Sequence, residues 1–188
     1  MTSCGPDGQP SLYTHMWSFP DYRQQGNNSQ SSQPALAPCF SPGSLYAYFY
    51  GNPSFSKFRT IIDRAQMIGQ LGGPQANFTI LAPKDESLTQ IPIEYFTKMD
   101  NGLAKQILDA SIIHRPQNRK ILTSSPVSYY ATKNPEMRMY ITNIGTKSGM
   151  VTRVNNCASI VEWDIECDNG IIHVVDNIIA PNMDHFMN

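Results

Sequence analysis

The sequence predicts an α+β fold built as one domain of ordinary size, and three observations lead to this class. Segments with the helical spacing of apolar residues come first, and short runs typical of strands follow from residue 121 onward. This segregation favours helices packed on antiparallel sheets over a doubly wound parallel sheet. The 188 residues are enough for one domain with an appended segment.

The chain divides near residue 54 into an N-terminal arm (1–53) and a domain (54–181), followed by a short tail (182–188). The arm has no lysine, seven of the 14 prolines and a low-complexity polar run at 24–33, which is typical of a linker. Yet nine of the 19 aromatic residues also lie in it, and their large apolar area predicts a surface on which they bind. These nine residues are Tyr13, Trp17, Phe19, Tyr22, Phe40, Tyr46, Tyr48, Phe49 and Tyr50.

Three interpretations of the arm stay open at this point. It is an idle tail, or it folds back on its own domain, or it docks on other chains and orders as it binds. We favour the third, in which the nine rings fill pockets on neighbouring subunits. The prolines limit the conformational entropy that such an arm loses on ordering.

The helical elements are expected in the first half of the domain. One stripe of apolar residues predicts a helix over 54–71, which Gly72, Gly73 and Pro74 end. A buried strand over 77–82 stops at Pro83, and short helical turns are expected over 84–89 and 92–99. A second long helix is predicted over 101–113.

Strands dominate the second half. They are predicted over residues 127–131, 137–142, 150–155, 159–166 and 171–179. Asn169 and Gly170 separate the last two, and this pair is a strong signal for a tight turn because Gly adopts positive φ and Asn tolerates it.

Two segments, with a histidine between them, indicate a family. Residues 79–88 form a strand that ends in Ala82-Pro83 and leads into a short acidic helix, and residues 169–181 form an apolar strand behind the Asn-Gly turn. His114 follows the second long helix. Together they resemble a fasciclin-like domain over roughly residues 54–181. The resemblance implies a fasciclin-like fold, with N-terminal helices on antiparallel sheets that form a wedge or sandwich.

The polar residues of these segments have structural interpretations. Asp85 is placed to cap the helix that follows it, and Asp176 bonds backbone donors where the last strand bends. His173, inside an apolar run, is expected to be a hydrogen-bonded core histidine, and His114 to join the same network or to cap carbonyls. With Asn169, these residues hold the fold.

No enzyme, cofactor or metal is expected. The sequence lacks a Gly-x-Ser-x-Gly nucleophile elbow, a phosphate-binding loop and a Cys-x-x-Cys pair. A net charge of −1 and the absence of a long apolar run predict neither nucleic-acid binding nor membrane insertion. Fasciclin-like domains are known mainly as adhesion and interaction modules, which agrees with these expectations.

A possible adhesion motif lies just before the last hairpin. Residues 162–165 (Glu-Trp-Asp-Ile) resemble the Glu-Pro-Asp-Ile stretch that matrix members of the family present for integrin recognition, with Trp163 in place of the proline. This would make Asp164 and Ile165 the binding residues. The alternative is structural, with Asp164 bonding backbone groups and Ile165 packed inward.

Two functions remain, and both are non-enzymatic. The first is a structural component of a large assembly, whose arm docks between neighbouring protein subunits; fasciclin-like folds also occur as minor capsid proteins in virions of large DNA viruses. The alternative is a secreted or cell-surface adhesion module that binds matrix or receptor proteins. The first residues show no signal-peptide pattern, which favours the assembly.

Cysteine pairing and glycosylation stay open. Cys157 and Cys167 are either disulfide partners across two strands or small buried apolar residues, and Cys4 and Cys39 lie in the arm. Asn27 and Asn77 start acceptor sequons. Burial of the strand at Asn77 is expected to make it a poor acceptor.

Overall fold

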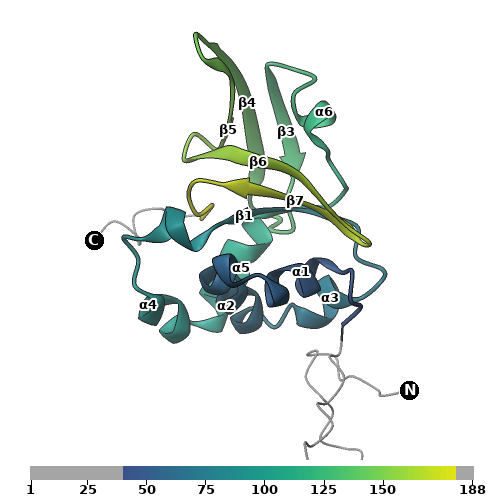
Figure 1. Cartoon of the computed structure of the whole chain (residues 1–188), viewed down its shortest axis with the longest axis vertical. Helices are drawn as coiled ribbons and strands as arrows, with labels where there is room; N and C mark the ends of the chain where they lie inside the picture. The colour runs from purple at the N-terminus through teal and green to yellow at the C-terminus, as the bar shows by residue number, and fades with distance from the viewer. Residues whose placement is uncertain (1–39, 181–188) are drawn as a thin grey trace, which may run out of the picture.

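The computed structural model describes residues 40–180, in which helices dominate the first half and strands the second. The helices are α1 (Leu45–Gly51), α2 (Ser56–Arg64), α3 (Ile68–Gly72), α4 (Ile93–Lys98), α5 (Asn101–Ala110) and α6 (Arg119–Leu122), with 3-10 turns at Pro53–Phe55 and Asp85–Leu88. Figure 1 shows α1 to α5 as a layer beneath one part of the sheet, while α6 lies beside β3 (Val127–Ala131). No helix within these residues is both long and apolar enough to cross a bilayer.

One mixed sheet of seven strands carries the rest of the fold. Its order is β2-β1-β7-β6-β5-β4-β3. Besides β3 the strands are β1 (Phe78–Pro83), β2 (Ile112–Ile113), β4 (Arg138–Thr146), β5 (Gly149–Val154), β6 (Ala158–Cys167) and β7 (Gly170–Val175). The predicted α+β class is confirmed, and the sheet is mixed because β1 and β7 pair in parallel, from Phe78 opposite Gly170 to Pro83 opposite Val175.

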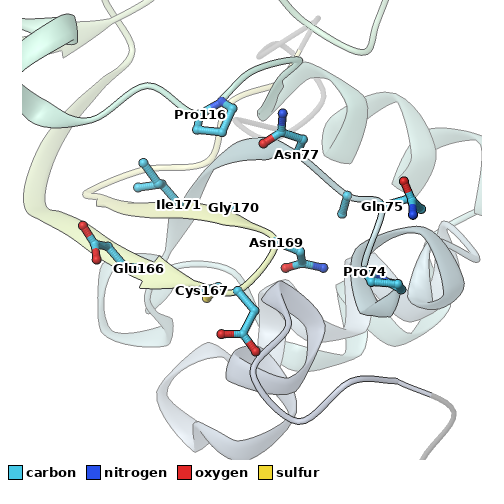
Figure 2. A pocket seen from close by; sticks show the side chains of 11 residues that line it. Pro74, Gln75, Asn77, Pro116, Glu166, Cys167, Asn169, Gly170 and Ile171 are labelled. Carbon is cyan, nitrogen blue, oxygen red and sulfur yellow. The ribbon is translucent and has the colours of Figure 1, made fainter.

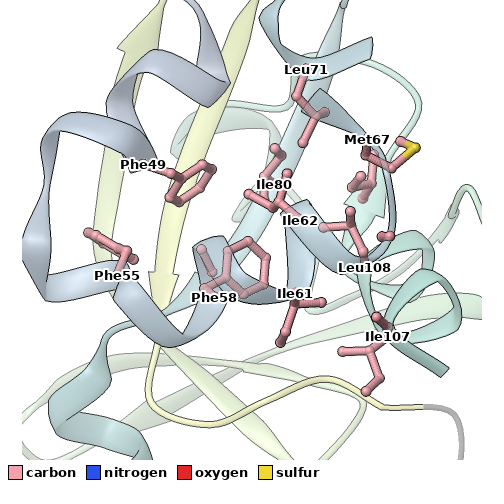
Figure 3. Packing of buried hydrophobic residues seen from close by; sticks show 14 of the residues in the cluster. Phe49, Phe55, Phe58, Ile61, Ile62, Met67, Leu71, Ile80, Ile107 and Leu108 are labelled. Atoms are coloured by element: carbon pink, nitrogen blue, oxygen red, sulfur yellow. The ribbon is translucent and has the colours of Figure 1, made fainter. Parts of the chain in front are cut away.

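The main core lies between the helical layer and the β1–β7 part of the sheet. Figure 3 shows Phe49, Phe58 and Ile61 packed toward Ile80 of β1, and all four side chains are fully buried. A second cluster fills the space under the β4–β5 part and includes Met139 and Ile141. Each fully buried large apolar side chain contributes about 1.5–3 kcal/mol.

Helix α1 corrects the predicted domain boundary. Ser44 accepts a hydrogen bond from the N–H of Ala47 and so starts the helix, whose Leu45, Tyr46 and Phe49 are buried in the main core. Residues 40–53 therefore belong to the domain and not to an arm. An aromatic cluster in a proline-rich setting has the composition of a docking segment as well as that of a short core helix, so composition alone does not distinguish the two.

Two predicted helices are shorter than expected. The helix predicted over 54–71 breaks into α2 and α3 because Gln66 adopts a left-handed conformation (φ 56°). The helix predicted over 101–113 ends at Ala110, and the β-branched pair Ile112–Ile113 forms β2 against β1. The predicted strands all occur, and the last one ends at Val175.

Candidate interaction surface

Strand β6 contains a bulge at the predicted adhesion motif. Its register against β7 shifts between Glu162 and Ile165, and Asp164 has a φ of 54°. The other described non-glycine residues with positive φ lie in turns, so Asp164 is the one such residue inside a strand. A non-glycine residue in this conformation costs free energy, which the surrounding contacts must offset.

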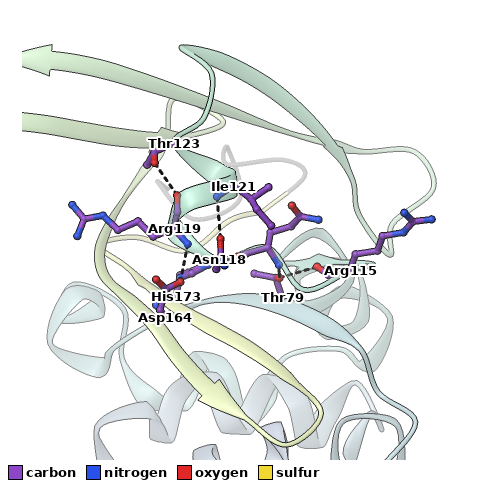
Figure 4. A network of polar contacts seen from close by, with 9 residues as sticks. Thr79, Arg115, Asn118, Arg119, Ile121, Thr123, Asp164 and His173 are labelled. Carbon is purple, nitrogen blue, oxygen red and sulfur yellow. Dashed lines mark hydrogen bonds and ion pairs between the residues drawn. The ribbon is translucent and has the colours of Figure 1, made fainter.

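Those contacts form a small polar network (Figure 4). The N–H of Asp164 donates to Nδ1 of His173 at 3.0 Å, and Nε2 of His173 donates to the carbonyl of Gln117 at 2.7 Å. The Asp164 carboxylate accepts from the N–H of Arg119 at 2.7 Å, at the first residue of α6. The bulge thereby holds both the imidazole of β7 and the start of α6 in place.

Burial lowers the pKa of His173, and the carbonyl of Gln117 and the carboxylate of Asp164 raise it by less. The ring is fully buried in β7 and already uses both nitrogens, one as acceptor and one as donor. A second proton would abolish the acceptor that the Asp164 N–H needs. His173 is therefore a neutral core histidine that supports the bulge.

The bulge exposes a carboxylate beside an aromatic ring. The Asp164 side chain is 37% exposed, while Ile165 is half-buried against the main core. Trp163 packs edge-on against His173, with ring centroids 5.2 Å apart, and the guanidinium of Arg119 lies 5.3 Å from the Trp163 ring. The two predicted adhesion residues thus separate: Asp164 reaches the surface and Ile165 packs inward.

Thr79 is a part of this network that the sequence analysis missed. It is buried in β1, where its hydroxyl donates to the carbonyl of Arg115 and accepts from the N–H of Gln117. The loop that carries Gln117 is thereby held against the sheet. The only sequence signal is a hydroxyl residue inside an otherwise apolar strand.

Of the two roles expected for His114, joining the network of His173 is wrong. His114 is exposed and lies edge-on to Phe78, with ring centroids 6.4 Å apart. The position next to His173 is instead taken by the backbone of Gln117, three residues further along. The chain leaves β2 before His114 and turns outward, which the sequence did not reveal.

Asp85 caps a helix, but not the one predicted. Its carboxylate accepts from the N–H groups of Ser56 (3.1 Å) and Lys57 (2.9 Å), at the start of α2. The 3-10 turn that begins at Asp85 has no side-chain cap. The partner lies nearly thirty residues earlier in the chain, so local sequence favoured the wrong helix.

The remaining signature residues hold the ends of β6 and β7. Asn169 is buried in the turn between them, and Asp176 accepts from the N–H of Ser159 at 2.6 Å just past β7. Asn177 follows, donating to the carbonyl of Cys157. These side chains are all engaged with the backbone.

An open cavity of about 530 Å³ lies at the β6–β7 turn (Figure 2). Its walls include Asn77, Pro116, Glu166 and Cys167. Burial raises the pKa of the Cys167 thiol to about 11, so this thiol is protonated and a poor nucleophile near neutral pH. No group of three metal-ligating side chains gathers anywhere in residues 40–180.

The nine aromatic residues predicted as docking anchors now fall into three groups. Tyr13, Trp17, Phe19 and Tyr22 lie outside the described residues. Tyr46 and Phe49 are core residues, so they are unavailable to a partner, and Phe40 and Tyr48 pack against the same core. Tyr50 is 58% exposed and lies 5.8 Å from the guanidinium of Arg59.

The structure also shows whether Cys157 and Cys167 pair and how exposed Asn77 is. Cys157 and Cys167 are free thiols at opposite ends of β6, about 30 Å apart at the usual rise per residue, so they do not pair. Asn77 is exposed, contrary to expectation, because β1 begins one residue later. Cys4, Cys39 and Asn27 lie outside the described residues.

Comparison with known proteins identifies the fold. The chain is 27% identical over 117 residues to transforming growth factor-beta-induced protein ig-h3 of Sus scrofa, an alignment that covers 59% of this chain and 16% of that protein. It is 27% identical over 150 residues to stabilin-2 of Rattus norvegicus (74% of this chain, 9% of that protein). It is 29% identical over 131 residues to protein sll1735 of Synechocystis sp. (66% of this chain, 88% of that protein).

A solved structure agrees with these relatives. The FAS1 domain pair of the insect cell adhesion molecule fasciclin I superposes with a TM-score of 0.63 at 19% identity, covering 75% of this chain and 51% of that one. The chain spans only a small part of the length of ig-h3 and stabilin-2. The fasciclin domain model matches residues 53–181. This chain therefore belongs to the fasciclin domain family.

Proposed function

We propose that this protein is a non-catalytic adhesion module that binds an extracellular or cell-surface protein through the bulge of β6. Family membership and the shared fold with a cell adhesion molecule support adhesion. The observation that carries the choice of surface is Asp164, which is held in a left-handed conformation with its carboxylate exposed. Bulges and strained residues occur preferentially at functional sites.

The chemistry of this surface suits a protein partner. One carboxylate oxygen of Asp164 is used by the N–H of Arg119, while the other has no hydrogen-bond partner among residues 40–180. That oxygen is available to a cationic side chain or to a divalent cation held by the partner. Trp163 and Arg119 lie beside it, and Trp and Arg are among the residues enriched at binding hot spots.

Polar groups of the segments that resemble the family hold the fold, which supports a binding role without catalysis. Asp85 and Asp176 are bound to backbone N–H groups, and His173 has both ring nitrogens occupied. A general base needs a free lone pair within reach of its substrate. His173 offers none and Asp85 uses both carboxylate oxygens, whereas Asp176 keeps one exposed carboxylate oxygen without a hydrogen-bond partner among residues 40–180.

The comparisons favour adhesion over the assembly role that the sequence suggested first. The relatives and the structural neighbour named above give no support to a capsid or virion, and the burial of Tyr46 and Phe49 removes two of the nine proposed docking rings. The proposal includes a location at the cell surface or in the extracellular space, with a matrix or receptor protein as partner.

Cell attachment tests this proposal. Surfaces are coated with the full chain, and the attachment of cultured fibroblasts is measured in Mg²⁺ and in EDTA. We expect Asp164→Asn to reduce attachment about tenfold, because it removes the charge but keeps an oxygen for the N–H of Arg119 and a side chain that tolerates positive φ.

Glu166→Gln is the matched control, since Glu166 is an exposed carboxylate two residues further along the same strand. Equal attachment to both variants would overturn the assignment of the surface. Attachment of the unaltered chain no better than to albumin would overturn adhesion itself.

A further inference from the structure

Strand β3 is an open edge of the sheet. It lies last in the strand order, and β4 is its only strand neighbour apart from a single bridge between Thr132 and Ile113 just past its end. The N–H of Asn143 donates to the carbonyl of Pro126, so in the antiparallel ladder the backbone groups of Val127, Tyr129 and Ala131 point away from β4. No backbone partner for those groups of Val127 and Tyr129 occurs among residues 40–180, whereas just past Ala131 the N–H of Lys133 donates to the carbonyl of Ile112 in β2.

Natural edges are usually protected, and this one is not. Lysine, proline or a bulge on an edge strand blocks pairing with another chain. Residues 127–131 are Val-Ser-Tyr-Tyr-Ala, with no charge, no proline and no register shift against β4. Although α6 lies beside β3 in Figure 1, it forms no backbone pair with it.

The outer face next to this edge carries several apolar side chains beside Arg138, Thr142 and Arg153. Antiparallel sheets with one solvated face normally alternate apolar inward and polar outward. Here Met139 and Ile141 point into the second core cluster, whereas Tyr129 (66% exposed) and Val161 (58% exposed) face outward. By register, the outward residues of β3 to β6 include Val127, Tyr129, Tyr140, Ile144, Val151 and Val161.

The chain itself contains a segment that fits this edge. Residues 13–19 read Tyr-Thr-His-Met-Trp-Ser-Phe, so Tyr13, Trp17 and Phe19 alternate with smaller or polar residues at the period of a strand. Aromatic residues favour strands, and Pro20 ends the run. Asp21 follows, and the exposed Arg138 and Arg153 lie on the outer face to receive a carboxylate.

We propose that residues 13–19 of a second copy of this chain add as a strand to the free edge of β3 and lay their rings on its outer face. Backbone hydrogen bonds along the edge supply affinity, and the adjacent, mutually tilted rings of Tyr129 and Tyr140, whose centroids are 5.0 Å apart, supply specificity. Two copies that exchange these segments form a symmetric dimer.

A second copy fits better than the segment of the same chain. The described chain begins in the helical layer, where the N–H of Ser41 donates to the carbonyl of Gly72. Figure 1 shows this layer and β3 at opposite ends of the molecule. The twenty residues from 20 to 39 span at most about 70 Å when fully extended, so a return along the whole domain would require them to be extended over much of their length.

Sedimentation velocity of the full chain over a wide concentration range tests the inference. We expect the unaltered chain to dimerise. Tyr129→Ser removes a ring from the face, and Ala131→Pro removes an outward N–H from the edge while leaving the rings. Each should raise the dimer dissociation constant at least about tenfold. Tyr50→Ser is the matched control, because Tyr50 is a similarly exposed ring on the helical layer.

A mixing experiment separates exchange between copies from docking within one chain. Trp17→Ala impairs the segment and Tyr129→Ser impairs the face, so neither variant should dimerise alone. Their mixture retains one intact segment and one intact face, and it should form a heterodimer. A monomeric unaltered chain, a mixture that stays monomeric, or a dimer weakened equally by Tyr50→Ser would each overturn the inference.

This inference extends the proposed function to self-association, and the two can fail separately. Fibroblast attachment depends on Asp164 in β6, whereas dimerisation depends on Tyr129 in β3. A chain that does not dimerise but still supports cell attachment would overturn only the strand exchange and leave the proposed adhesion function in place.

Discussion

The side-chain oxygen of Asn169 accepts a hydrogen bond from the N–H of Leu45 at 2.8 Å, so the β6–β7 turn holds the first turn of α1. The same amide donates to the carbonyl oxygens of Leu71 (2.9 Å) and Gly73 (2.7 Å) at the end of α3. One buried side chain thereby joins two helices to the last hairpin. It also explains why α1 belongs to the domain.

Asn169→Ala should lower the free energy of unfolding by about 3 kcal/mol or more. The substitution leaves the N–H of Leu45 and two carbonyl groups without their partner, and an unsatisfied buried polar group costs about 1–3 kcal/mol. Urea denaturation measures the loss. Asn101→Ala, at an exposed position in the first turn of α5, is the control, and an equal loss in both variants would contradict the clamp.

Two truncations test the position of the domain boundary. A chain that begins at residue 40 should keep a melting temperature close to that of the full protein. A chain that begins at residue 54 loses Leu45 and Phe49, both fully buried, and should lose most of its cooperative unfolding transition because removal of a single buried Phe side chain costs about 3–5 kcal/mol. Calorimetry of both chains measures the two melting transitions. Similar melting temperatures would show that residues 40–53 are not part of the domain.

Asp85→Ala should cost about 1–2 kcal/mol, the usual range for loss of a helix cap. The physical reason is that the N–H groups of Ser56 and Lys57 lose their acceptor at the start of α2. Chemical denaturation with Glu86→Ala as the neighbouring control measures the effect. An equal loss of unfolding free energy in Glu86→Ala would attribute the effect to negative charge near the turn and not to capping of α2.

The stability of the protein should fall in mild acid because of His173. Its folded-state pKa lies below the unfolded value of about 6.5, so the unfolded state binds the extra proton first. The free energy of unfolding should therefore decrease as the pH falls below about 6.5, by at most about 1.4 kcal/mol per pH unit, until the folded pKa is reached.

Denaturation curves collected between neutral and mildly acidic pH measure this slope. His173→Gln should flatten it, whatever its effect on stability at neutral pH. A slope that persists in His173→Gln would assign the acid sensitivity to other groups.

Local patterns in the sequence predicted most of the elements. The strand at Val127–Ala131 occurs where expected, and the others differ by a few residues at their ends. Alternation of apolar residues and an Asn-Gly turn are local signals, so the elements that they predict depend little on long-range contacts. The family resemblance likewise depended on short segments whose apolar residues now form β1 and β7.

Long-range contacts were the part that the sequence did not reveal. Local sequence associates Asp85 with its own turn because its partner on α2 is distant in the chain. It also gives no sign that Gln117, and not His114, contacts His173. The left-handed turn at Gln66 divides α2 from α3, and it contains no glycine or proline from which the break could be predicted. In each case tertiary contacts favour one of several conformations that the local sequence alone would make nearly equal in free energy.

The parallel pairing of β1 with β7 has a consequence for biosynthesis. These strands are separated by most of the domain, yet each residue from Phe78 to Pro83 pairs with one from Gly170 to Val175. A ribosome must translate nearly the whole domain before β1 acquires this neighbour. Until then, the nascent chain carries a central strand with one side unpaired, and closure must await a contact of high sequence separation, which slows folding. A premature stop codon before residue 170 would therefore release a chain that chaperones and proteases recognise as unfinished.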